Sequence, residues 1–216
     1  MTMDNKDNRC FTGDLEKACS ILRNGGLVAF PTDTLYALGA NIFDESAINK
    51  VFETKERLRN MALPVLIGKI DDIYKIAFDV DKNIRALMEA FWPGPLTLVL
   101  KKKSDISDVL TAGNHTVAVR MPNHQLALDL IKNVGSPLTG TSANSYGGTD
   151  PTHAYIVKEQ IGSRVDMILD GGICPMQGAS TILDVSSQPP KLIRQGVLSY
   201  EELRRVFKTT GGLDGI

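Results

Sequence analysis

Segments with helical periodicity alternate with short apolar segments along almost the whole chain, and this alternation limits the possible folds more than any other feature. Apolar residues at helical spacing predict helices within residues 15–22, 47–52, 84–91, 126–131, 154–161 and 200–207. Short apolar runs predict strands within residues 27–30, 65–67, 96–100, 117–119, 167–169, 181–185 and 192–193. Such alternation predicts an α/β fold, in which helices cover a sheet.

The composition is that of an ordinary globular protein. The 216 residues are 43% hydrophobic and 23% charged, which excludes wholesale disorder and allows one large core. With 24 Lys and Arg against 25 Asp and Glu, overall charge gives no argument for nucleic-acid binding. No Gly- and Ser-rich linker divides the chain, so we expect one domain over residues 10–208 with flexible tails at 1–9 and 209–216.

Cysteine usage and hydropathy predict where the protein works. Cys10, Cys19 and Cys174 form no CxxC motif and are too sparse for a disulfide framework, which indicates a reducing compartment. The polar N-terminus lacks the apolar segment of a signal peptide, and no apolar run approaches the length of a membrane-spanning helix. We therefore expect a soluble, cytoplasmic protein that does not bind membranes.

Several familiar motifs are absent from the sequence. No GxGxxG follows the first predicted strand, and segment 172–180 lacks the lysine and the glycine spacing of a phosphate-binding loop. Ser142 is not part of a nucleophile elbow. His115, His124 and His153 have no histidine four residues away and no nearby cysteine, so we expect no structural metal site.

Polar residues gather instead at the ends of predicted elements, where α/β proteins bind ligands. Segment 31–39, PTDTLYALG, follows the first strand and presents Thr34, although a turn held by its own Thr and Asp side chains would also explain it. Lys55 and Arg57 lie two residues apart and can converge on one anion only if their helix ends near them. The alternative is a solvated basic helix end, which suits the helix dipole.

The remaining polar residues follow the same pattern. Thr116 begins a strand that ends at Arg120, Ser142 and Asn144 follow an apolar segment, Ser180 opens a strand and Arg194 closes one. Lys and Arg side chains interleaved with hydroxyl groups are typical of a site for a polyphosphate and a small polar ligand.

Taken together, these motifs resemble one known family. They are PTDTLYALG at 31–39, Lys55-x-Arg57, WPGPLT at 92–97, VRMP at 119–122, SAN at 142–144, STILD at 180–184 and Arg194-x-Gly196. From about Leu15 to Phe207 the chain resembles the YrdC/TsaC family of L-threonylcarbamoyladenylate synthases in its single-domain form. The resemblance implies an open, twisted mixed sheet with flanking helices and a large positively charged cavity, called YrdC/RibB-like.

The resemblance also implies a nucleotidyltransferase reaction. ATP, L-threonine and bicarbonate give threonylcarbamoyl-AMP and pyrophosphate, and downstream threonylcarbamoyl-transfer proteins modify the adenosine beside the tRNA anticodon. ATP is then a substrate, Mg²⁺ is expected with its phosphates, and tRNA is a candidate partner. The N-carboxylate of threonine attacks the α-phosphorus in line, so positioning and charge stabilisation suffice without a protein nucleophile.

Site residues are assigned by the same resemblance. The ATP contacts are Lys55, Arg57, Thr116, Ser142, Asn144 and Arg194, and the threonine contacts are Thr34, Arg120 and Ser180. Lys55 and Arg57 would position the phosphates and stabilise their charge, Arg120 suits the threonine carboxylate, and no protein metal ligand is assigned. The chain departs from the family's usual Gly, Pro, Pro, His and Ser at Ala37, Leu58, Ala62, Leu66 and Asp150, respectively.

Two other functions remain open at this point. An RNA-binding module could use the same basic cavity without catalysis, although aromatic residues make up only 6% of the chain and none interleave the basic residues. An ATP-dependent enzyme of another kind, such as a carbamoyl-transfer domain, is the second. A pocket that bonds a hydroxylated amino acid through Thr34 and Ser180 would distinguish the synthase from both.

Overall fold

The computed structural model describes residues 11–12 and 14–209. The predicted N-terminal tail at 1–9 lies outside the described residues, as does Cys10, and so does the predicted C-terminal tail except Thr209. Both tails therefore stay predictions. Within the described residues no helix is both long and apolar enough to cross a membrane.

The strands form two mixed sheets. The five-stranded sheet has the order β1 (Phe11–Thr12), β9 (Met167–Leu169), β2 (Val28–Phe30), β3 (Ala37–Gly39) and β8 (Thr141–Ser142). The six-stranded sheet has the order β11 (Lys191–Arg194), β10 (Thr181–Asp184), β5 (Leu96–Lys101), β6 (Thr116–Arg120), β4 (Val65–Leu66) and β7 (Leu138–Thr139). Parallel and antiparallel pairs occur in both sheets, and the chain passes from one sheet to the other between β7 and β8.

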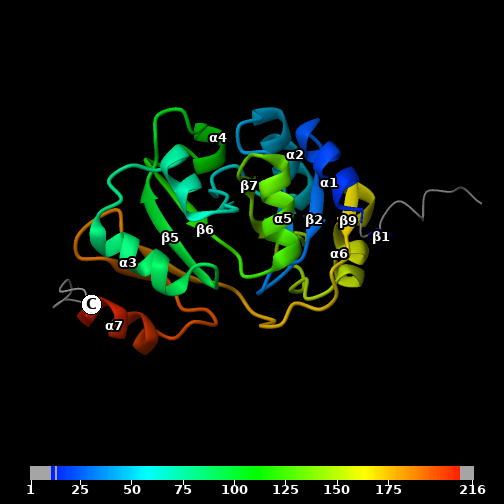
Figure 1. The fold of residues 1–216 in the computed structure, drawn as a ribbon. Coiled ribbons are helices and arrows are strands. Elements are labelled where there is room, and N and C mark those ends of the chain that lie inside the picture. The colour runs from blue at the N-terminus through cyan, green and yellow to red at the C-terminus, as the bar shows by residue number, and fades with distance from the viewer. Residues whose placement is uncertain (1–10, 13, 210–216) are drawn as a thin grey trace, which may run out of the picture.

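Helices cover the two sheets (Figure 1). The α-helices are α1 (Leu15–Arg23), α2 (Glu45–Lys55), α3 (Lys82–Phe91), α4 (Asp108–Thr111), α5 (Gln125–Val134), α6 (Ala154–Ile161) and α7 (Tyr200–Thr209), and the 3₁₀ helices are η2 (Ile70–Lys75) and η3 (Gly162–Arg164). Helix α1 packs on α5 beside the five-stranded sheet, whereas α3 packs on α7 beside the other sheet. Aspartate side chains begin three of these helices, since Asp14, Asp44 and Asp81 each accept a hydrogen bond from a backbone amide of the first turn.

One hydrophobic core joins both sheets, because Leu38 of β3 and Leu98 of β5 belong to the same buried cluster. A second cluster lies on the other face of β2, where Val28 and Phe30 pack against α1 and α5. Strand β2 is therefore covered on both sides, which explains its continuous apolar sequence.

The structure confirms the predicted α/β class, the predicted helices and the predicted strands. The strands occupy two sheets, whereas the sequence pattern suggested a single one. Strands β1, β3, β7 and β8 were not predicted, since they are only two or three residues long and too short to show alternation. As a result, the predicted loop 31–39 ends in strand β3. Pairing of β3 with β2 and with β8 fixes the position of this end of the loop. The short helices α4, η2 and η3 were not predicted either.

Candidate functional site

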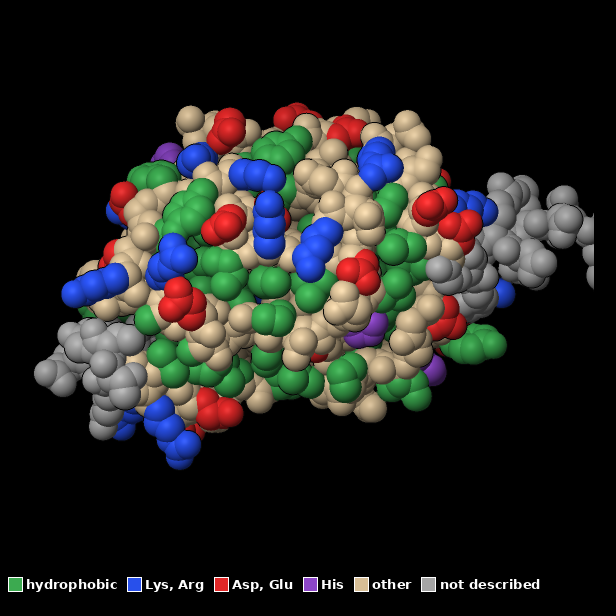
Figure 2. Space-filling view, viewed as in Figure 1, with side chains coloured by type: hydrophobic (Ala, Val, Ile, Leu, Met, Phe, Trp, Pro, Cys, Tyr) green, Lys and Arg blue, Asp and Glu red, His purple; other side chains and the backbone are tan. Residues whose placement is uncertain are grey.

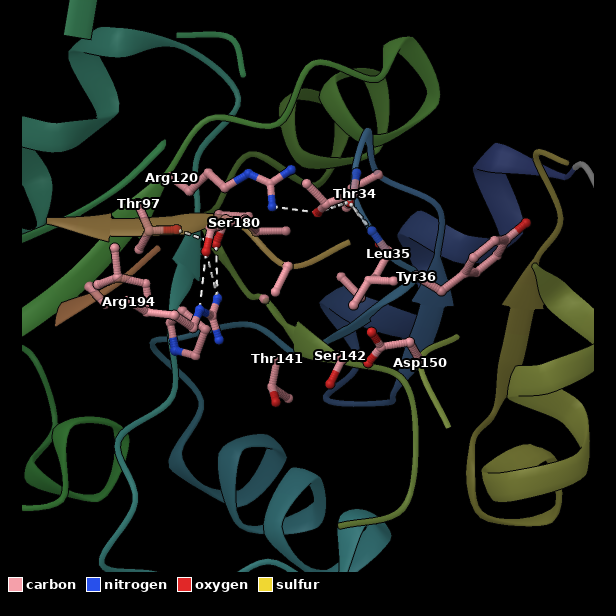
Figure 3. Close-up of a pocket in the computed structure, with 18 of the residues that line it drawn as sticks. Thr34, Leu35, Tyr36, Thr97, Arg120, Thr141, Ser142, Asp150, Ser180 and Arg194 are labelled. Carbon is pink, nitrogen blue, oxygen red and sulfur yellow. Dashed lines mark hydrogen bonds between the residues drawn. The ribbon is translucent and has the colours of Figure 1, made fainter. Parts of the chain in front are cut away.

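A cavity of about 310 Å³ lies between the two sheets (Figure 3). One face of the six-stranded sheet contributes Thr97, Ala118, Arg120, Ser180 and Ile182. The residues that alternate with these, such as Leu98 and Val119, point into the core. The five-stranded sheet supplies segment 32–37 and Ser142 on the other side. Residues far apart in sequence thus meet in one place.

Arg120 is the most firmly held cation of the cavity. Its Nε donates to Gly94 O at 3.0 Å, its Nη1 donates to Thr34 Oγ1 at 2.7 Å, and its Nη2 forms an ion pair with Asp33. The other carboxylate oxygen of Asp33 is buried without a hydrogen-bond partner among the described residues. The guanidinium is therefore fixed in orientation before any ligand arrives, as a bidentate anion site requires.

Segment 31–39 serves as both a turn and a cavity wall. Thr32 Oγ1 accepts hydrogen bonds from the backbone amides of Thr34 and Leu35 at 3.1 and 3.2 Å, as the turn interpretation predicts. Thr34 nevertheless faces the cavity, where its hydroxyl contacts Arg120. Ala37, where the family usually has Gly, pairs with Phe30 and Ser142 inside β3, and its φ is not positive. The substitution therefore imposes no strain.

Ser180 and Arg194 form the opposite wall. Ser180 Oγ lies 2.8 Å from Thr97 Oγ1, and Arg194 donates to Ser180 O through Nη2 at 2.9 Å. Figure 3 shows these three side chains side by side, opposite Thr34. Thr97 was not assigned to the site from the sequence. Two features of the sequence could have indicated it: Thr97 belongs to the WPGPLT motif, and it alternates with the apolar Leu96 and Leu98 along the strand.

Arg57 reaches the cavity because helix α2 ends two residues before it. Helix α2 stops at Lys55, and Glu56 takes up a left-handed conformation with φ of 53°. Arg57 Nη1 then donates to Thr141 Oγ1 at 3.3 Å, and its Nη2 donates to Ala62 O at 3.0 Å. Its buried Nε has no hydrogen-bond partner within the described chain.

Lys55 does not converge with Arg57 on the cavity. Its side chain is buried, and its Nζ donates to Ser142 O at 2.5 Å, to Asn144 O at 2.7 Å and to Asn144 Oδ1 at 2.9 Å. Burial, assisted by the charge of Arg57, lowers the pKa of Lys55 to about 7. Neither Lys55 nor Asn144 lines the cavity; together they hold the loop that presents Ser142.

Thr116 is also placed away from the cavity. It begins β6, four residues before Arg120, and a strand of that length separates them by about 13 Å. Thr116 lines a different surface pocket, with Phe78 and Lys103. Of the nine residues assigned from the sequence, the cavity brings together Thr34, Arg57, Arg120, Ser142, Ser180 and Arg194.

The electrostatics of the cavity favour an anion. Burial lowers the pKa values of Arg57, Arg120 and Arg194, while Asp33 opposes this effect at Arg120 and Asp150 opposes it at Arg194. The ordinary pKa of arginine is so high that all three side chains remain charged at neutral pH. The outer surface differs, since Figure 2 shows Lys and Arg interspersed with Asp and Glu across the viewed face. The described residues contain no group of three His, Cys, Asp or Glu that could hold a metal by itself.

Comparison with known proteins gives consistent matches. The Sua5/YciO/YrdC family model, described as telomere recombination, matches residues 20–196. A threonylcarbamoyl-AMP synthase of Pyrococcus abyssi is 41% identical over 190 residues, which cover 88% of this chain and 56% of that protein. A threonylcarbamoyl-AMP synthase of Vibrio vulnificus is 31% identical over 185 residues, which cover 85% of this chain and 98% of that protein.

A solved structure matches as well. The crystal structure of P. abyssi Sua5 complexed with L-threonine has a TM-score of 0.87 and 41% identity, covering 89% of this chain and 56% of that one. The present chain therefore spans a little over half the length of its P. abyssi relative.

Proposed function

This chain belongs to the Sua5/YciO/YrdC family, and on that premise we propose that it is a threonylcarbamoyl-AMP synthase. It would form threonylcarbamoyl-AMP and pyrophosphate from L-threonine, bicarbonate and ATP. The observation that carries this proposal is that one cavity is lined by Arg120, Thr34 and Ser180 together with Arg57, Arg194 and Ser142. Such a cavity offers hydroxyl groups and a fixed guanidinium for a hydroxylated amino acid, and further guanidinium groups for phosphates.

The threonine subsite lies at Arg120. The guanidinium, oriented by Asp33 and Gly94 O, would bind the threonine carboxylate through a charge-assisted hydrogen bond. The hydroxyl groups of Thr34 and Ser180 would bond the hydroxyl group of threonine. The P. abyssi structure complexed with L-threonine supports a threonine site in this fold.

The nucleotide subsite would use the other guanidinium groups of the cavity. Arg57 and Arg194 would bind phosphate oxygens, and the hydroxyl group of Ser142, which donates to Asn144 Oδ1 at 2.8 Å in this structure, would turn to donate to one of them. Lys55 and Asn144 would act on the nucleotide indirectly, since they hold the loop of Ser142 in place. Thr116 is left out of this subsite because it lies at the far end of β6.

The reaction requires no protein nucleophile. The amine of threonine takes up bicarbonate to become an N-carboxylate, with loss of water. A carboxylate oxygen of that group then attacks the α-phosphorus of ATP, and the bond to the β-phosphate oxygen breaks as pyrophosphate leaves. The arginines would hold both reactants in line and stabilise charge on the phosphates. Mg²⁺ bound to the triphosphate would neutralise part of that charge.

The chemistry of the product indicates which proteins would act after this enzyme. Threonylcarbamoyl-AMP is a mixed anhydride that must be consumed by a transfer reaction, so threonylcarbamoyl-transfer proteins acting on tRNA would follow this enzyme. Such a role would have the protein act in the cytoplasm, together with the tRNA that is modified.

Pyrophosphate release tests the proposal. We expect release that requires ATP, L-threonine and bicarbonate together and that stops when any one of them is omitted. Release that persists without threonine or without bicarbonate would overturn the assignment. RNA affinity that falls steeply with salt, without any ATP turnover, would favour the RNA-binding alternative.

A further inference from the structure

The cavity contains a carboxylate that the proposed reaction does not explain. Asp150 is the one acidic side chain among the described residues that line it, beside three guanidinium groups. Asp150 is exposed, and its carboxylate makes no hydrogen bond to any residue that the structure describes. Figure 3 shows it pointing into the space that Ser142 also faces.

The loop that carries Asp150 is anchored on both sides. Before it, Thr149 O accepts hydrogen bonds from Gln160 Nε2 at 2.8 Å and from Asn144 Nδ2 at 3.3 Å. After it, Pro151 O accepts from the backbone amide of Tyr36 at 2.8 Å. The backbone at Asp150 is therefore fixed, and the carboxylate is confined to the region of the cavity beside Ser142.

Asp150 reduces the positive charge that the cavity can offer to phosphate groups. Asp33 already neutralises Arg120, so Arg57 and Arg194 are the cations free to meet phosphates. Asp150 offsets one of these two charges, and its field is felt at Arg194. A bare triphosphate carries several negative charges and would be repelled by Asp150 at short range. A cation between the carboxylate and the phosphates would turn this repulsion into attraction.

We propose that Asp150 is a ligand, directly or through a bound water, for the Mg²⁺ that accompanies the triphosphate. The cavity would thereby select the metal-bound nucleotide over the free nucleotide. Mg²⁺ prefers oxygen ligands and is commonly held by one or two carboxylates together with substrate phosphates, which fits a single aspartate facing a phosphate subsite. The inference rests on the proposed function, because it assumes that a nucleoside triphosphate occupies this cavity.

Calorimetric binding tests the inference without turnover. The probe is an ATP analogue with a methylene bridge between the α- and β-phosphorus, titrated in excess Mg²⁺ and again in EDTA. We expect Mg²⁺ to tighten binding to the unmodified protein by at least about tenfold. In Asp150→Asn we expect this ratio to fall to about threefold or less, because the neutral amide both loses the metal and stops repelling the free analogue. The Asp71→Asn variant, which removes an exposed carboxylate of η2, should retain the full ratio.

Each other outcome has a definite meaning. Equal Mg²⁺ dependence in Asp150→Asn and the unmodified protein overturns the inference. A loss of threonine affinity alone in this variant, with the metal dependence unchanged, also overturns it and assigns Asp150 to the ammonium group of the amino acid. Failure of the unmodified protein to bind the analogue under either condition would instead contradict the proposed function. Electron paramagnetic resonance of Mn²⁺ in the ternary complex gives a second measure, since its signal should change in Asp150→Asn and not in Asp71→Asn.

Discussion

The amine of Lys55 donates a hydrogen bond to Asn144 Oδ1 at 2.9 Å and so ties the end of α2 to a loop 89 residues away in sequence. The same amine also bonds the backbone oxygens of Ser142 and Asn144. Asn144 in turn donates from Nδ2 to Gly148 O and Thr149 O. This chain of contacts makes Lys55 the support of the wall that carries Ser142 and Asp150.

Replacement of Lys55 by Met should therefore unfold the protein more easily. The substitution keeps the unbranched side chain as far as its ε position but removes all three hydrogen bonds of the amine and leaves Asn144 O without a side-chain donor, so we expect a loss of about 2–3 kcal/mol in the free energy of unfolding. Urea denaturation measures it, with Lys82→Met at the exposed start of α3 as the control. An unchanged unfolding free energy, with nucleotide binding alone weakened, would contradict the supporting role and make Lys55 a phosphate ligand.

Lys55 should also give stability a pH dependence. Its pKa is about 7 in the folded protein and about 10.5 when it is free, so between these values the unfolded chain holds the extra proton. Stability then rises with pH across this window. We expect the unfolding free energy of the unmodified protein, relative to Lys55→Met, to increase from pH 7 to about pH 9. A difference that stays constant or shrinks across this range would show that Lys55 keeps its proton in the fold.

Arg57 is expected to behave in the opposite way from Lys55. Arg57 is only half-buried and makes two hydrogen bonds, to Thr141 Oγ1 and Ala62 O, so Arg57→Ala should lower the melting temperature much less than Lys55→Met. Loss of a charge-assisted bond to phosphate should weaken nucleotide binding by about 1.5–3 kcal/mol. Arg59→Ala removes an exposed arginine two residues further on and is the matched control in calorimetric titrations. Equal nucleotide affinity in the two variants would remove Arg57 from the site.

The sequence predicted six of the seven α-helices that the structure describes, because each of the six is long enough to show a helical period. Most of the described strands have only two to four residues and show no period, and four of them, β1, β3, β7 and β8, were missed. The sequence also identified Arg120 and Ser180 correctly as residues at strand ends, which the structure places in one cavity. Thr116 illustrates the limit, since it lies on the same strand as Arg120 but at the other end. Strand alternation indicates which face a residue occupies, whereas only the pairing of strands shows which end reaches the ligand.

Lys55 illustrates a second limit. A lysine at a helix end is usually solvated, and nothing in the local sequence indicates that a loop 89 residues away would cover it. Gly140 shows the same dependence on distant residues, because a Cβ at this position would lie 2.5 Å from Leu66 Cγ. Its lack of a side chain lets the β7–β8 connection pass close to β4, a contact that exists only once the six-stranded sheet has formed.

The cavity should discriminate between threonine and valine, which have nearly the same shape. An apolar pocket would reject valine only weakly, whereas a pocket that bonds the hydroxyl leaves its own polar groups unpaired when valine binds. Thr34 and Ser180 offer such groups, and Leu66, where the family usually has His, lines the same cavity without offering one. We expect kcat/KM for threonine to exceed that for valine by at least about 100-fold, and Ser180→Ala to reduce this ratio about tenfold. Pyrophosphate release at fixed ATP and bicarbonate measures both, with the exposed Ser187→Ala as control. Equal kcat/KM for the two amino acids in the unmodified protein would show that the hydroxyl is not recognised and that Arg120 serves a different carboxylate.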